Sequence, residues 1–122
     1  MATTEEIVTA FGDAWNEADE SKRRELLALS WADEGRFVDP QSDVTGREAL
    51  LALISGFQKR MAGARIDGTS GVQVHHDKIR FNWKLIGADG KTMIEGLDFG
   101  ELAEDGRIRL IVGFWGDPPP AS

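Results

Sequence analysis

The sequence contains no cysteine, no tyrosine and no long hydrophobic run. The absence of cysteine excludes disulfide bonds, thiol catalysis and cysteine-ligated metals. The absence of tyrosine removes the phenolic hydroxyl from the donors available to any active site. No apolar stretch approaches the roughly 20 residues that span a bilayer, and the N-terminus carries acids where a secretory signal would carry a basic region. We therefore expect a cytoplasmic protein without a membrane segment.

Basic residues are outnumbered by acidic ones. The 122 residues include 14 Lys and Arg against 21 Asp and Glu, a net charge of −7, and no basic block is present. A nucleic acid or an anionic membrane is therefore not expected as a partner. Apolar residues make up 41% of the chain, so residues 1–122 are predicted to form a single domain around one core. Its ordered part is expected at about residues 4–116, followed by a proline-rich tail at 117–122.

The N-terminal part of the chain shows helical periodicity. A capping box formed by Thr3 and Glu6 opens the first predicted helix. A second, shorter helix is expected to restart at Asp19 or Ser21 and to run through Leu29. The first helix has an apolar stripe at the spacing of one helix face: Ile7, Val8, Phe11, Ala14, Trp15 and Ala18.

One strand and a third helix follow. The strand is predicted at Gly35–Asp39, because Pro40 imposes extended geometry on the residue before it. A second capping box, Thr45 with Glu48, is expected to start the third helix, which ends near Gly63. The core stripe of this helix consists of Leu50, Leu53, Ile54, Phe57 and Met61.

The rest of the chain alternates in the manner of strands. Two hairpins are predicted, one joining residues 65–76 to 78–87 and the other joining 91–102 to 107–115. The second turn contains Asp105–Gly106, a strong short-range hairpin signal. Three helices followed by four antiparallel strands predict an α+β domain, with the helices covering one face of the sheet. A strongly curved sheet with helices on its concave side would enclose a pocket.

Asp39 is the first candidate for chemistry. A carboxylate at a strand end that faces the helices could act as a general base. The alternative is an Asp-Pro turn, in which the side chain caps the following loop. The residues alone leave both interpretations open.

Asp98 is the second candidate, because Asp is uncommon inside strands. Alternation places it on one strand face with Gly96 and Gly100, and these glycines leave room for another backbone or for a ligand. A desolvated carboxyl there would stay protonated and could donate a hydrogen bond to a substrate oxygen. The alternative is an acid that faces solvent or pairs with Arg107 or Arg109.

Metal and cofactor sites are not predicted. His75 and His76 are adjacent on a strand, so they point to opposite faces and cannot ligate one ion in regular geometry. One of them could reach a pocket rim, or both lie at a solvated hairpin end. No loop has the spacing of a phosphate- or cofactor-binding motif.

These features together resemble the NTF2-like superfamily, in its SnoaL-like and ketosteroid-isomerase-like branch. The resemblance rests on the order of the elements, the strand end GRFVDP, the helix start VTGREAL and the terminal hairpin with EDGRIRLIVGFW. The resemblance covers about residues 4–116. It implies a cone, in which a curved antiparallel or mixed sheet wraps around three N-terminal helices and a deep apolar pocket lies between the sheet and the helices. The same fold hosts isomerases, cyclases, hydrolases, dehydratases and non-catalytic binders.

The resemblance also assigns roles to individual residues. Asp39 matches the general base of ketosteroid isomerase, and Asp98 matches its protonated oxyanion-hole aspartate. Limonene-epoxide-hydrolase-like chemistry needs an Asp–Arg–Asp arrangement, and Gly96 stands where its arginine would be. The residues expected to line the pocket and bind substrate are Phe11, Trp15, Ile54, Phe57, Phe81, Trp83, Leu85, Ile111, Gly113 and Trp115.

One departure from ketosteroid isomerase affects its oxyanion hole. The tyrosines of that enzyme match Phe11 and Ile54, so their hydrogen-bond network is absent here. Losing a principal oxyanion donor usually costs orders of magnitude in rate. Trp83 or Trp15 would have to donate the missing hydrogen bond.

Two functional hypotheses follow. The first is a small-molecule enzyme without a cofactor, which uses Asp39 and Asp98 for proton transfer on a hydrophobic carbonyl compound, as an isomerase, cyclase or lyase does. The second is a non-catalytic ligand-binding or dimerisation domain. In either case a homodimer is expected, because Met93, Leu97 and Phe99 form an apolar patch on the outer face of the sheet.

Overall fold

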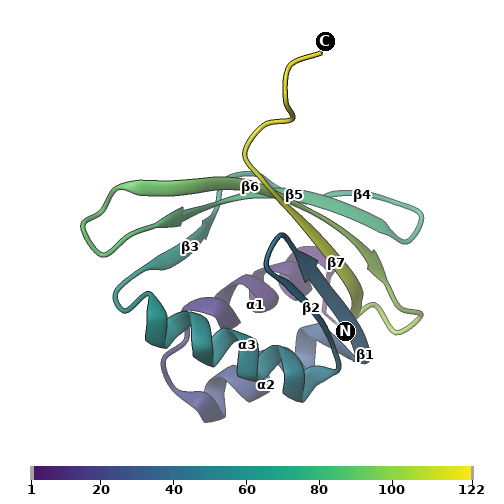
Figure 1. The fold of residues 1–122 in the computed structure, drawn as a ribbon. Coiled ribbons are helices and arrows are strands. Elements are labelled where there is room, and N and C mark those ends of the chain that lie inside the picture. The colour runs from purple at the N-terminus through teal and green to yellow at the C-terminus, as the bar shows by residue number, and fades with distance from the viewer. Residues whose placement is uncertain (1, 122) are drawn as a thin grey trace.

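The computed structural model describes residues 2–121, which form three helices and a seven-stranded sheet (Figure 1). The sheet has the order β2-β1-β7-β6-β5-β3, and β4 pairs with β5 outside this path. β1 and β7 are parallel, and the other pairs are antiparallel. The elements are α1 (Thr4–Asn16), α2 (Glu20–Ser30), β1 (Trp31–Asp39), β2 (Ser42–Thr45), α3 (Arg47–Arg60), β3 (Arg65–Gly68), β4 (Gln73–His75), β5 (Lys78–Ile86), β6 (Thr92–Leu102) and β7 (Ile108–Trp115).

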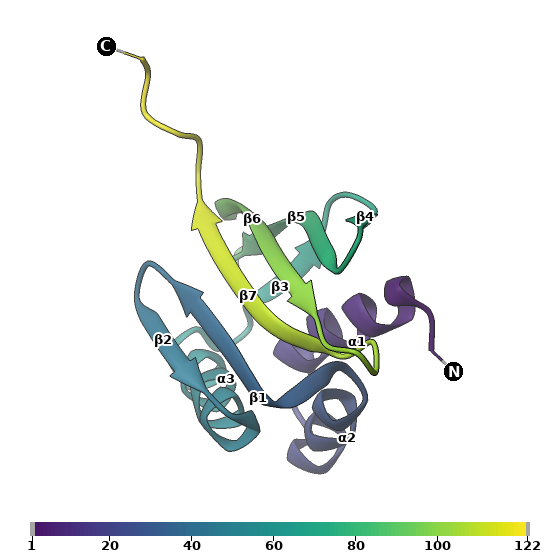
Figure 2. The same ribbon diagram turned by 90° about the vertical axis from the view of Figure 1, so that its right-hand side faces the viewer.

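The sheet curls over the helices without closing on itself, so the three helices lie on its concave side (Figures 1 and 2). This arrangement confirms the predicted α+β cone with a mixed sheet. Residues 117–121 form no helix or strand and project away from the sheet (Figure 2). Met1 and Ser122, at the ends of the predicted domain, lie outside the described residues. None of the helices within residues 2–121 is long and apolar enough to cross a bilayer.

The two N-terminal helices begin where the sequence predicts. Thr3 Oγ1 accepts from the Glu6 backbone N–H at 3.1 Å, and Glu6 Oε1 accepts from the Thr3 N–H at 3.0 Å, which confirms the capping box. Asp19 caps α2 by accepting from the Lys22 N–H. Leu29 does not continue a core face, since its side chain is 48% exposed.

The second predicted capping box is wrong. Thr45 is the last residue of β2, where it pairs with Arg36 of β1 in extended geometry. The N-cap of α3 is Gly46, with φ of +97° and no side-chain cap. Glu48 instead forms an ion pair with Arg24 of α2 at 2.8 Å. The pairing of β2, a strand that the sequence pattern did not reveal, therefore overrides the local capping signal.

The predicted strand at 65–76 is interrupted. β3 and β4 both pair with β5, and residues 69–72 between them leave the ladder. Ser70 replaces a backbone partner here, since its Oγ accepts from the Asn82 N–H at 2.8 Å. The second predicted hairpin forms as expected between β6 and β7, with Gly106 at φ of +88° in its turn.

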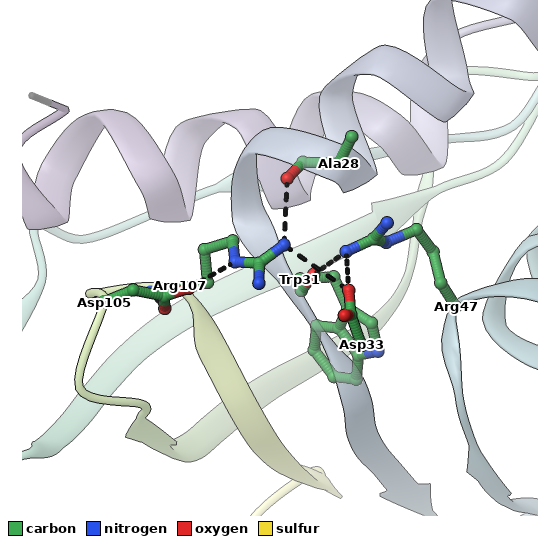
Figure 3. A network of polar contacts seen from close by, with 6 residues as sticks. All are labelled: Ala28, Trp31, Asp33, Arg47, Asp105 and Arg107. Carbon is green, nitrogen blue, oxygen red and sulfur yellow. Dashed lines mark hydrogen bonds and ion pairs between the residues drawn. The ribbon is translucent and has the colours of Figure 1, made fainter.

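A polar network holds the start of β1 (Figure 3). Arg47 donates from Nη2 to the Trp31 carbonyl at 2.8 Å and to Asp33 at 2.7 Å. Arg107, from the end of the β6–β7 turn, also faces Asp33 and pairs with Asp105 at 2.9 Å. The ring of Trp31 is fully buried and stacks on Phe11, with centroids 5.4 Å apart. These contacts join β1 to α3, α1 and the terminal hairpin at the end of the cone where the core is packed.

Candidate functional site

A cavity of about 500 Å³ lies between α1, the C-terminal half of α3 and the concave face of the sheet. Its volume is in the range of small-molecule sites. Most of its wall is apolar. The predicted binding residues that lie on this wall are Phe11, Trp15, Phe57, Phe81, Trp83, Leu85, Gly113 and Trp115.

Two of the predicted binding residues are not on the cavity wall. Ile54 and Ile111 are fully buried in the core, where the helices pack directly against the sheet. Their periodicity gives the correct inward face, but it does not show how deep along the cone a residue lies. Both residues lie in the packed core and not among the residues that line the cavity.

Asp39 and Asp98 both line the cavity and lie in one row across the sheet. Asp98 of β6 is opposite Gly113 of β7. On the other side of β7, Val38 pairs with Val112, so Asp39 follows beside Gly113. A Cβ atom on Gly113 would lie 2.9 Å from Asp98 Oδ1 and 3.5 Å from Asp39 Cβ. The absence of a side chain at Gly113 thus leaves the space between the two acids open.

Asp98 is a buried acid, with only 7% of its surface exposed. Burial raises the pKa of its carboxyl to about 7, the hydrogen bond from Trp83 opposes that rise, and the charge of Asp39 adds to it. Arg107 and Arg109 do not pair with Asp98, because they face Asp33, Asp105, Asp77 and Glu101. Near neutral pH a large fraction of Asp98 is therefore protonated and able to donate a hydrogen bond.

Trp83 holds the Asp98 side chain in place. Its indole Nε1–H donates to Asp98 Oδ1 at 3.0 Å. The room that Gly96 leaves on this strand face is filled by the Trp83 ring, and a Cβ atom on Gly96 would overlap that ring. Because the indole N–H is already engaged, Trp83 is not free to donate to a ligand. Trp15 lines the cavity, and its indole N–H makes no hydrogen bond within residues 2–121, so it remains the candidate second donor.

Replacing Gly96 by Ala is expected to destabilise the protein by about 1–3 kcal/mol, the usual cost of overpacking. The new methyl group would displace the Trp83 ring and break its hydrogen bond to Asp98. Urea unfolding followed by tryptophan fluorescence measures the effect. Gly12→Ala is the matched control, since a Cβ atom on Gly12 of α1 meets nothing within 4 Å and alanine favours helix. Equal stability of the Gly96→Ala variant and the wild type would contradict this packing.

Asp39 both caps a turn and lines the cavity, so its position is compatible with both of the interpretations that the sequence left open. Its Oδ1 accepts from the Gln41 backbone N–H at 2.9 Å and so caps the turn after Pro40. Its side chain is also half-buried on the cavity wall. Oδ2 takes part in no hydrogen bond within the described residues. One oxygen therefore orients the carboxylate while the other can accept a proton from a bound molecule.

His75 and His76 are exposed at the β4–β5 turn, away from the cavity. His76 adopts a positive φ of 54°, and the two rings meet edge to face. Among residues 2–121, no three His, Cys, Asp or Glu side chains gather in a metal-binding arrangement.

Sequence reasoning missed several polar residues of the cavity wall. Arg60 lies at the end of α3, and Asn82 lies on β5 opposite the strand break. Asp13 projects from α1. The one local signal was for Arg60, which falls on the cavity-facing stripe of its helix. The remaining polar residues of the wall are Glu5, Thr9, Gln41, Ser42 and Ser70.

No protein-family model matches the sequence, and no curated protein matches it. Among solved structures, a proposed isomerase of the SnoaL-like family from Agrobacterium tumefaciens is 32% identical. It matches with a TM-score of 0.86 over 94% of this chain and 100% of that chain.

Two further structures share the fold at 20% identity. An NTF2-like protein of unknown function from Exiguobacterium sp. has a TM-score of 0.74, over 92% of this chain and 99% of its own. A proposed polyketide cyclase from Sinorhizobium meliloti has a TM-score of 0.69, over 88% of this chain and 92% of its own. The identity to the Agrobacterium protein over almost the whole length shows that the chain belongs to the SnoaL-like family of the NTF2-like superfamily.

Proposed function

We propose that the protein is an enzyme that moves a proton next to the carbonyl group of a small hydrophobic molecule, in isomerase-, cyclase- or lyase-type chemistry. One observation carries this proposal. Two carboxyl groups in different environments flank Gly113 on the wall of one apolar cavity. When two titratable groups lie in different surroundings, one can act as the base and the other as the acid, and such pairs are typical of acid–base sites.

The two acids take complementary roles in the proposed reaction. Asp39 removes the proton from the carbon beside the carbonyl, and the electron pair of that C–H bond moves to the carbonyl oxygen. Protonated Asp98 donates a hydrogen bond to the resulting oxyanion, with Trp83 fixing its other oxygen. Asp39 then returns the proton, to the same carbon or to another one. Since the pKa of Asp98 is about 7, its donor form is lost above neutral pH.

Deuterium exchange tests this function without knowledge of the natural substrate. A panel of hydrophobic ketones and enones is incubated with the protein in D₂O, and loss of the α-proton signal is followed by NMR. We expect saturable exchange for some panel members, with a rate that falls as the pH rises through about 7. Saturable binding without exchange for every member would contradict the enzyme and support a binding module.

The binding module is the second candidate function. It is favoured by Phe11, which places a phenyl ring on the cavity wall where the resemblance to ketosteroid isomerase implies a tyrosine. An apolar cavity with few hydrogen-bond donors can hold a ligand without reacting with it. In this case variants of the cavity wall would change affinity only.

We also propose that the protein is a homodimer through the outer face of the sheet. Phe114 is 59% exposed. Met93, expected on this face, is 55% exposed and also lines the cavity, so it lies at the margin of the patch. Phe114 pairs with Leu97, and Phe99 pairs with Val112, so these apolar side chains are neighbours across β6 and β7.

Light scattering of the wild type is expected to give the mass of a dimer. Phe114→Glu would place a charge in the interface and raise the dissociation constant by about 10-fold or more. Leu29→Glu on α2 is the control, because Leu29 is exposed but lies on a helix outside the sheet. A monomeric mass for the wild type would overturn the dimer.

A further inference from the structure

Arg60 interrupts an otherwise apolar face of α3. Leu53, Phe57, Arg60 and Met61 line the cavity at the i, i+4, i+7, i+8 spacing of one helix face. Arg60 is the charged member of a stripe whose other three residues are apolar, and it is exposed at the C-terminal end of the helix. It is therefore accessible both to solvent and to a molecule bound in the cavity.

Arg60 also differs from the other arginines of the chain in having no partner. It makes no hydrogen bond or ion pair with another residue in the range 2–121. The other arginines, by contrast, each donate at least one hydrogen bond to a named side chain or backbone group. A guanidinium group presents a planar fork of donors that fits a carboxylate, and here that fork is unused.

The side chain of Arg60 lies back along its helix. Its Nη1 is 3.1 Å from the position that a Cβ atom on Gly56, one turn earlier, would occupy. Gly56 thus gives the guanidinium room to lie close to the helix. A basic residue near the C-terminus of a helix interacts favourably with the helix dipole, and this could by itself account for Arg60. Lys59 supplies a positive charge at the same helix end without lining the cavity, so the dipole does not account for the position of Arg60 on the wall.

Arg60 lies toward the β5–β6 turn. The C-terminal end of α3 packs on this turn, since a Cβ atom on Gly63 would lie 2.9 Å from the Ala88 Cβ. Ile94 lies near this turn, where it pairs with Leu85, and Asp98 lies four residues further along β6, where it pairs with Phe81. Because four residues along a strand span about 13 Å, Asp98 lies about that far from the part of β6 near the turn. The other charged residues of the cavity wall are all acids: Glu5, Asp13, Asp39 and Asp98.

We propose that Arg60 binds a carboxylate at the far end of the substrate, so that the ligand is a hydrophobic carbonyl compound that also carries a carboxylate. The reacting carbon lies at Asp39 and Asp98, and the carboxylate lies on the order of 10 Å away at Arg60, near the β5–β6 turn. The ionised carboxylate of Asp39 at one end repels the anion while Arg60 attracts it, which orients the ligand in the cavity. This inference rests on the proposed function, because it takes the end with Asp39 and Asp98 as the reacting end.

A competition experiment tests the carboxylate site by binding alone. N-phenyl-1-naphthylamine, a neutral fluorescent probe of apolar cavities, is displaced by decanoate or by decanamide, which differ in the charge of one end. In Arg60→Gln, decanoate is expected to bind about 3- to 20-fold more weakly, while decanamide and the probe keep their affinities. Lys59→Gln is the matched control, since it removes a neighbouring charge outside the cavity, and it should leave both competitors unchanged.

Three results would overturn the carboxylate site. They are failure of decanoate to displace the probe from the wild type, no loss of decanoate affinity in Arg60→Gln, and an equal loss for decanoate and decanamide. None of these results bears on the proposed function, because α-proton exchange of neutral ketones does not require Arg60. Conversely, absence of exchange together with a decanoate-specific loss would leave a carboxylate-binding module.

Discussion

Replacing Asp39 by Asn is expected to slow α-proton exchange of a reactive ketone by about 10²- to 10⁴-fold, the usual contribution of a general base. The amide cannot take up the proton. The Asn oxygen can still accept from the Gln41 N–H, as Asp39 Oδ1 does at 2.9 Å, so the turn after Pro40 is expected to persist. NMR exchange rates at saturating ketone measure the loss, and the affinity for the ketone should change little.

Asp13→Asn is the control for this substitution. Asp13 also lines the cavity, but it projects from α1 and is exposed, so the exchange rate is expected to stay within a few-fold of the wild-type rate. A carbon-detected NMR titration adds a readout that needs no substrate. In Asp39→Asn the pKa of Asp98 should fall below about 7, because the charge of Asp39 helps to raise it. An unchanged exchange rate in Asp39→Asn would refute the assignment of the base.

Replacing Asp98 by Asn is expected to stabilise the protein at alkaline pH. The pKa of Asp98 is about 7 in the folded state against an ordinary value of 3.8, so the folded protein binds the proton more tightly than the unfolded chain. The stabilising contribution of the protonated group is complete below pH 3.8, decreases as the pH rises, and is lost by about pH 7. Asn stays neutral at every pH and can still accept from Trp83.

Urea unfolding at a series of pH values measures this effect. Between pH 5 and pH 8 the free energy of unfolding of Asp98→Asn, relative to the wild type, is expected to rise by about 2 to 3 kcal/mol. Other titrating groups are common to both proteins and cancel in the difference. Asp13→Asn, which removes an exposed carboxyl group of the same cavity wall, serves as the control. A difference for Asp98→Asn that is flat would show that Asp98 is ionised in the folded protein and does not act as a donor.

These two variants separate stability from activity. The protein has a buried acid at Asp98. Above pH 7 a neutral amide of the same shape would cost less free energy to bury than this carboxylate. Functional sites often keep such unfavourable groups. If Asp98→Asn is both more stable and slower in exchange, the cost of the buried carboxyl is explained by its role as a proton donor.

Local patterns predicted most of the secondary structure. The alternation along residues 91–102 placed Asp98 on one strand face with Gly96 and Gly100, and Asp105–Gly106 marked the terminal hairpin. Pro40 placed Asp39 at the end of a strand. The errors arose where pairing with a neighbouring strand competed with a local signal. Thr45 pairs with β1 instead of capping α3, and the stretch at 65–76 breaks where Ser70 bonds to β5.

The candidate site was less accessible to sequence reasoning than the fold. Periodicity selected the inward face for Ile54 and Ile111, yet both residues lie in the core because depth along the cone depends on how the helices pack. The sequence shows that Trp83 carries an indole N–H donor, but it does not show which group accepts the hydrogen bond. Its bond to Asp98 requires the register of β5 with β6 and the vacant space at Gly96.

The sequence by itself determined most of the elements, their order, and the faces that the helix stripes present, because these follow from contacts between residues close in the chain. Only the tertiary structure decided that Asp39 and Asp98 flank one glycine, since this needs the parallel pairing of β1 with β7, two strands far apart in the sequence. It also decided that Arg60 lies at the cavity wall without a partner among residues 2–121. Register and curvature are set by such long-range pairings, and no local pattern encodes them.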